Sequence, residues 1–200
     1  FRSEGGVLRG HRIFAESYVG TAGAEELKRL LEAPLPAYQG MSFKQALQEF
    51  LFELWIEPGR SLLDQVGLTV ARVLSVKTSA HGETVVALDM NRSNLNSGDL
   101  SVLMNPTMIY QEGETTDEAP SEQGVFFGGN LCASDFVTRH KTMVKRLPTS
   151  GDLVIFHNTA GYLMDFAETK THLHRVARKV AIQEVKGDFR WSLDDTYEPL

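Results

Sequence analysis

The chain has 200 residues, of which 42% are hydrophobic and 23% charged, and its 20 Lys and Arg against 26 Asp and Glu give a formal net charge of −6. This composition is typical of a folded globular domain and excludes an intrinsically disordered chain. The acidic balance disfavours binding to nucleic acid or to an anionic membrane, and no apolar run approaches the roughly 20 residues of a membrane span. A single cysteine permits no internal disulfide, and we expect a cytoplasmic protein.

Two short helices are predicted in the first part of the chain. Residues 24–33 are strong helix formers with acidic residues at the front and leucines at helical spacing, and Pro34 ends the run. In the next helix, Ser42 and Gln45 form a capping-box pattern in front of apolar residues spaced i, i+3, i+4 and i+7. The compact apolar run 54–56 that follows predicts a strand, so this part of the chain has the rhythm of an α/β protein.

From residue 68 onward, β-branched runs separated by turn residues predict a mainly β region. The expected strands are 68–76, 83–90, 101–110, 125–127, 152–157 and 175–185. The polar segment 112–123 predicts a loop, and residues 160–168 predict one short helix. The fold class is therefore mainly β, with an N-terminal α/β piece over residues 1–60 and a β-barrel or sandwich over residues 61–200.

Four short motifs stand between residues 54 and 162. They are Leu54-Trp55-Ile56-Glu57-Pro58-Gly59-Arg60, Gly129-Asn130-Leu131-Cys132, Gly151-Asp152-Leu153-Val154 and Ala160-Gly161-Tyr162. Each one alone is typical of an ordinary turn or strand start. In this order, from about residue 40 to the end, they resemble the carboxyl-terminal half of the pyridoxal-phosphate (PLP) amino-acid decarboxylases of the alanine-racemase fold. That group includes the diaminopimelate, ornithine and arginine decarboxylases.

The resemblance implies that the intact protein removes the α-carboxylate of an amino acid with PLP as cofactor. Glu57 would face the pyridine nitrogen, and the Gly59 amide and the Arg60 guanidinium would bind the phosphate. Tyr162 would donate its hydroxyl to the same phosphate. Cys132 would enter the active site of the partner subunit in a homodimer and protonate the α-carbon, a role that suits the pKa of a thiol, about 8.5.

The same resemblance divides the chain near residue 60. Residues 1–60 would be the last part of the PLP-binding (β/α)8 barrel, and residues 61–200 would be the β domain. The family's lysine that binds the cofactor covalently and its triple-glycine phosphate loop have no counterpart here. We therefore expect the chain to begin after that loop and to be inactive by itself.

The position after Cys132 departs from the pattern of the diamino-acid enzymes. Those enzymes have an acidic residue there that binds the far end of the substrate, whereas this chain has Ala133. Asp135 is the candidate for a substrate-binding carboxylate, at a different offset. The amino acid, which could be an unusual or modified one, and its D or L configuration stay open.

The residues also allow two other functions. His172 and His174 are two positions apart and would share one face of a strand, so with His140 or His157 they could form the three-histidine metal site of a cupin-like β-barrel. No carboxylate stands at a regular ligand spacing beside them, and we assign no metal. The third possibility is a noncatalytic β domain that acts in subunit contact.

Overall fold

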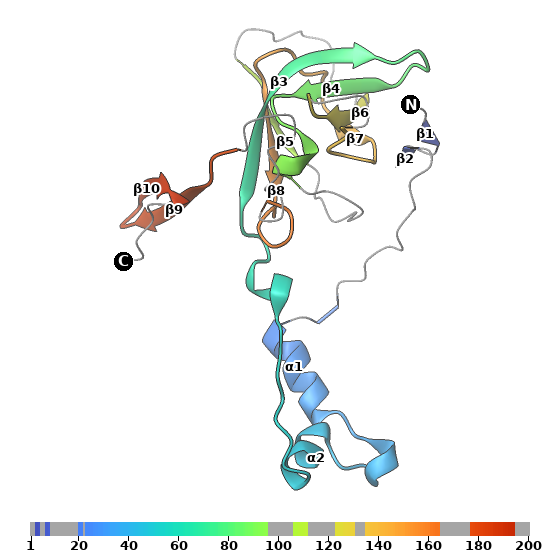
Figure 1. The fold of residues 1–200 in the computed structure, drawn as a ribbon, viewed down its shortest axis with the longest axis vertical. Helices are drawn as coiled ribbons and strands as arrows, with labels where there is room; N and C mark the ends of the chain where they lie inside the picture. The colour runs from blue at the N-terminus through green and yellow to red at the C-terminus, as the bar shows by residue number, and fades with distance from the viewer. Residues whose placement is uncertain are drawn as a thin grey trace.

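The computed structural model describes residues 3–4, 7–8, 20–21, 23–95, 106–111, 123–130, 135–164 and 177–194. Of Arg60, only the backbone is described. Figure 1 shows a β body from which a helical segment extends in one direction and a small β-hairpin in another. A further short antiparallel pair is formed by β1 (Ser3–Glu4) and β2 (Val7–Leu8).

Two α-helices, α1 (Gly23–Glu32) and α2 (Phe43–Glu49), confirm the helices predicted in the first part of the chain. The 3-10 turn η1 (Pro36–Tyr38) lies between them. The capping box of α2 is present, because the Ser42 Oγ accepts from the Gln45 backbone N–H at 3.2 Å and the Gln45 Oε1 accepts from the Ser42 backbone N–H at 2.8 Å. Among the described residues, no helix has the length and apolar character needed to cross a membrane.

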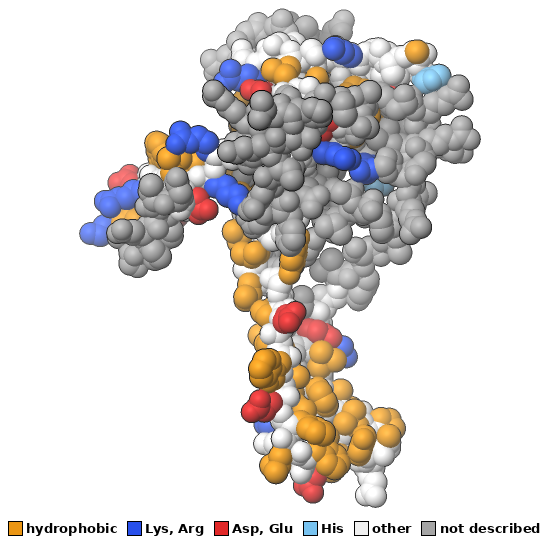
Figure 2. Space-filling view, in the orientation of Figure 1, with side chains coloured by type: hydrophobic (Ala, Val, Ile, Leu, Met, Phe, Trp, Pro, Cys, Tyr) orange, Lys and Arg blue, Asp and Glu red, His pale blue; other side chains and the backbone are white. Residues whose placement is uncertain are grey.

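The strand predicted at 54–56 does not form. Residues 52–58 have no secondary structure and run as a straight segment between α2 and the β body. Leu54, Trp55 and Ile56 are 44%, 84% and 56% exposed, and Figure 2 shows hydrophobic side chains gathered along this segment and the helices. A strand requires a neighbour that pairs with its N–H and C=O groups. No other described strand pairs with this segment, so the predicted α/β arrangement of residues 1–60 is not confirmed.

The β body is a six-stranded sheet in the order β5-β8-β3-β4-β6-β7, and Figure 1 shows that it curves into a nearly closed, barrel-like form. Its strands are β3 (Leu68–Thr78), β4 (Thr84–Leu88), β5 (Thr107–Ile109), β6 (Gln123–Gly128), β7 (Thr142–Val144) and β8 (Leu153–His157). Strand β3 has two successive partners along its length: it pairs with β8 up to Arg72 and with β4 from Val73 onward. The register of the β3–β4 pair shifts between Val73 and Ser75, next to the point where β3 changes from one partner to the other. All pairs in this sheet are antiparallel except β4 with β6.

A large hydrophobic core fills the β body, and Phe126 and Phe136 form a second, smaller buried cluster. Along β3, Thr69, Ala71 and Val73 are buried and their neighbours are exposed, which is the period-two pattern of a half-buried strand. Phe127 of β6 packs edge-on against Phe156 of β8, with ring centroids 5.8 Å apart. The mainly β fold predicted from residue 68 onward is confirmed.

Three further segments differ from the sequence prediction or extend it. Residues 160–164 form turns rather than the start of a helix, and residues 165–168 lie outside the described part of the chain. The predicted loop 112–123 also lies outside it, apart from Gln123, which begins β6. Strand β9 (Val180–Val185) confirms part of the last predicted strand, and it pairs with β10 (Asp188–Leu193), which the strand pattern did not predict.

Candidate functional site

A glycine and a tyrosine from distant parts of the chain meet where the straight segment joins the β body. Gly59 begins the 3-10 turn η2 (Gly59–Leu62), and Tyr162 lies in the turns after β8. A Cβ atom placed on Gly59 would lie 2.9 Å from the hydroxyl oxygen of Tyr162. This separation is too short for an ordinary Cβ contact, so the approach of the hydroxyl requires glycine at position 59.

Both residues have a left-handed backbone, with φ of +48° at Gly59 and +71° at Tyr162. Glycine adopts this conformation readily, whereas for a bulky residue such as tyrosine it costs on the order of 1–3 kcal/mol and persists only where the surroundings enforce it. The phenol is therefore held over the glycine by the surrounding structure. Tyr162 is 41% exposed, so the residue lies at the surface of the β body rather than in its core.

Hydrogen bonds to one carbonyl close the turn that contains Gly59 and Arg60. The Ser61 backbone N–H and the Ser61 hydroxyl both donate to the Pro58 carbonyl oxygen, at 3.1 and 2.6 Å. A Pro-Gly pair favours a tight turn, and these hydrogen bonds show that one forms here. The turn gives the backbone of Gly59 and Arg60 a defined course next to Tyr162.

Main-chain hydrogen bonds join the loop after this turn to the loop before Tyr162. The Ala160 N–H donates to the Val66 carbonyl at 3.0 Å, and the Thr159 N–H donates to the Gly67 carbonyl at 3.1 Å. A Cβ on Gly67 would lie 2.6 Å from the Ala160 nitrogen, so the two backbones are in close contact. Sequence reasoning misses this contact, since a glycine directly before a strand indicates a turn or a close approach without naming its partner.

The structure describes the other predicted cofactor and catalytic residues only in part. Glu57 is exposed on the straight segment, two residues before Gly59. Arg60 lies in η2, and its side chain is outside the description. Cys132 and the Ala133 that follows it are also outside the described residues, so the predicted proton donor stays a prediction.

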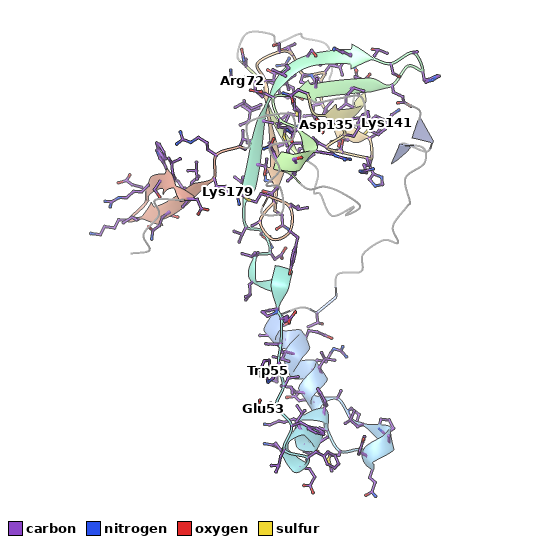
Figure 3. All side chains as sticks on the ribbon, in the orientation of Figure 1. Glu53, Trp55, Arg72, Asp135, Lys141 and Lys179 are labelled. Atoms are coloured by element: carbon purple, nitrogen blue, oxygen red, sulfur yellow. The ribbon has the colours of Figure 1, made fainter. Side chains whose placement is uncertain are left out.

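Asp135 is buried and holds a loop together. The residue is only 3% exposed, and its Oδ1 accepts a hydrogen bond from the Arg92 backbone N–H at 2.8 Å. Arg92 begins the 3-10 turn η3 (Arg92–Asn94), and Figure 3 shows Asp135 inside the β body. The Asp135 carbonyl accepts from the Gly129 N–H at 2.6 Å, which ties together the ends of the segment that contains Cys132. Substrate binding by Asp135 stays a prediction, because the contacts described here are structural.

We expect Asp135→Ala to lower the free energy of unfolding by about 1–3 kcal/mol, because the Arg92 N–H loses its acceptor. The measurement is the urea unfolding midpoint of the intact protein. Asp89→Ala is the matched control, since Asp89 is exposed, and its effect should stay within about 0.5 kcal/mol. A substrate-binding role would instead raise KM and leave the unfolding midpoint unchanged.

The histidines of the alternative metal site are not brought together in the described part of the chain. There, no group of three or more His, Cys, Asp or Glu residues is arranged to hold a metal ion. The His157 Nε2 lies 2.7 Å from the Thr107 hydroxyl, a contact between β8 and β5. His172 and His174 lie outside the described residues, and their predicted role is untested.

Comparison with known proteins gives one curated relative and a set of solved structures. No protein-family model matches the chain. It is 29% identical over 168 residues to the uncharacterized protein y4yA of Sinorhizobium fredii (strain NBRC 101917 / NGR234), and the match covers 83% of this chain and 36% of that protein. The chain thus spans about a third of the length of this relative.

Several solved structures with a similar fold are decarboxylases. A diaminopimelate decarboxylase is 21% identical with a TM-score of 0.59, covering 74% of this chain and 36% of that one. The diaminopimelate decarboxylase from Helicobacter pylori complexed with L-lysine is 19% identical with a TM-score of 0.56, covering 76% and 34%. The lysine/ornithine decarboxylase from Vibrio vulnificus complexed with cadaverine is 22% identical with a TM-score of 0.50, covering 68% and 35%. At the level of the fold, the chain is therefore similar to about a third of these decarboxylases, and its β body is consistent with their β domain.

Proposed function

We propose that this chain is the carboxyl-terminal part of a PLP-dependent amino-acid decarboxylase, a carboxy-lyase that acts at the α-carbon. The observation that carries the proposal is the approach of the Tyr162 hydroxyl to the backbone at Gly59. Two motifs that are separate in the sequence, and that the family resemblance assigns to one phosphate, lie in contact. The fold likeness to diaminopimelate and lysine/ornithine decarboxylases supports the same function.

The described residues fit the phosphate of PLP. A dianionic phosphate is bound by several donors that converge on it, often including backbone N–H groups at a glycine. Here a phenol hydroxyl stands beside the backbone of a glycine, in the space that a Cβ would fill, and Arg60 follows in the same turn. Tyr162, Gly59 and Arg60 would therefore hold the phosphate in this protein.

The remaining groups of the chain would act on protons. PLP, when bound, accepts the electron pair that is left on the α-carbon after carbon dioxide departs. The exposed carboxylate of Glu57, two residues before Gly59, would keep a proton on the pyridine nitrogen. The thiol of Cys132 would deliver a proton to the α-carbon in the partner subunit of a homodimer. The substrate would be an amino acid, which could be an unusual or modified one.

The proposal is tested by removing the phosphate donors in the intact protein. We expect Tyr162→Phe and Arg60→Ala each to raise the dissociation constant of PLP by about 10- to 100-fold, since a hydrogen bond to a charged group contributes about 1.5–3 kcal/mol. PLP titration followed by absorbance measures this constant.

Tyr110→Phe is the matched control for this titration. The Tyr110 hydroxyl donates to the Arg146 carbonyl at 3.0 Å, away from Gly59, so its loss should leave PLP affinity unchanged. If Tyr162→Phe and Arg60→Ala both bind PLP as tightly as the natural protein, the phosphate does not bind at this turn and the proposal is wrong.

A further inference from the structure

Asn158 connects the loop before Tyr162 to the loop that follows the Gly59 turn. Its Oδ1 accepts from the Gln65 backbone N–H at 2.9 Å, and its Nδ2 donates to the Asp64 Oδ1 at 3.1 Å. Both ends of the side-chain amide are thus used on one neighbouring loop that is distant in the sequence.

The backbone alone does not explain an asparagine at this position. Asn158 has φ of +56°, a left-handed conformation that asparagine tolerates and that glycine adopts at less cost. What asparagine adds is an acceptor and a donor on one rigid group. Aspartate would lack the donor that reaches Asp64, and glycine would lack both.

The bridge made by Asn158 acts together with buried contacts that fix the same two loops. The Thr69 hydroxyl donates to the Thr159 hydroxyl at 3.0 Å in the interior, next to the main-chain bonds at Val66 and Gly67. These contacts join residues 66–69 to residues 159 and 160. Asn158 is instead joined to residues 64 and 65, which lie closer to η2 in the chain. Tyr162 follows four residues later in its strained left-handed conformation, which the surroundings must enforce.

We propose that Asn158 is a positioning residue for the phosphate site: its amide holds the loop 63–66 against the turns 158–162 and so sets the separation between the Tyr162 hydroxyl and the turn at Gly59. This inference rests on the proposed function, because the site that it positions is the proposed phosphate site. Asn158 acts through Tyr162.

The test is Asn158→Gly in the intact protein, which accommodates the left-handed backbone and removes the side chain together with its two hydrogen bonds. Lys186→Gly is the matched control, since Lys186 also has a left-handed φ, +55°, and is exposed in the turn between β9 and β10. We expect the dissociation constant of PLP to rise about tenfold in Asn158→Gly and to stay unchanged in Lys186→Gly. An unchanged constant in Asn158→Gly overturns the inference.

A double-variant cycle separates positioning from a general structural role. If Asn158 acts through the Tyr162 hydroxyl, Asn158→Gly adds less than about a twofold further loss of affinity once Tyr162 is already phenylalanine. Effects that multiply in the double variant overturn the inference, because they show that Asn158 supports cofactor affinity independently of Tyr162.

Hydrogen exchange of the cofactor-free protein gives a readout that needs no PLP. Asn158→Gly should raise amide exchange in peptides covering 59–66 and 158–163, and Lys186→Gly should not. Unchanged exchange in both peptides overturns the inference. Raised exchange in a protein whose natural form binds no PLP supports the positioning of the loops and overturns the proposed function, so the two failures are distinguishable.

Discussion

Glu57→Gln in the intact protein is expected to keep PLP bound while turnover falls on the order of 100-fold or more, the loss typical when one electrostatic partner of the reacting charge is removed. A neutral amide cannot hold a proton on the pyridine nitrogen as a carboxylate does, so the ring accepts the electron pair less well. The proposed phosphate donors at Gly59 and Tyr162 are untouched by this change. Carbon dioxide release from a panel of amino acids measures turnover, and absorbance measures the bound cofactor.

Glu53→Gln is the matched control for Glu57. Both carboxylates are exposed on the same straight segment, but Glu53 accepts a hydrogen bond from the Trp55 Nε1 at 3.1 Å, and Figure 3 shows the pair side by side on that segment. We expect near-normal turnover in this variant. Near-normal turnover in Glu57→Gln as well would remove Glu57 from the proposed ring-nitrogen role and leave the phosphate site unaffected.

Gly67→Ala is expected to lower the free energy of unfolding by about 2–5 kcal/mol, the sum of a left-handed alanine and an overpacked contact. Gly67 has φ of +82°, and a Cβ there would lie 2.6 Å from the Ala160 nitrogen and 2.9 Å from its Cβ. The backbone at Thr159 and Ala160 is joined to the other loop by two hydrogen bonds, so moving it aside costs free energy. Because the same contact aligns the loops beside Gly59, PLP affinity should fall together with stability.

A second glycine, Gly82 in the turn between β3 and β4, separates the cost of a left-handed alanine from the cost of the overpacked contact. Gly82 has φ of +77°, and a Cβ there would meet nothing within 4 Å, so Gly82→Ala carries only the backbone cost of about 1–2 kcal/mol. Urea unfolding of both variants measures the difference. Equal losses of stability would show that the close approach of Gly67 to Ala160 contributes nothing.

The sequence by itself determined the elements whose signals are local. The capping box of Ser42 and Gln45 forms as predicted, because its four atoms lie within one helical turn. The run 68–76 predicts a strand and forms β3, but the face that it buries is not the one that hydropathy selects, since Thr69 is buried between exposed Leu68 and Val70. The Pro-Gly turn at Gly59 is likewise a local conformation. Through the family resemblance, the motifs also predict that Gly59, Arg60 and Tyr162 act as one group.

Only the tertiary structure decided which of these elements have partners. The apolar run 54–56 has the composition of a strand, yet it forms none in the described part of the chain, because pairing depends on a neighbouring strand and not on composition. The contact of Gly59 with Tyr162 and the bridge from Asn158 to Gln65 join segments far apart in the sequence. No local pattern encodes such a distance, which is set by the curvature of the β body and by the close packing of two backbones at Gly67.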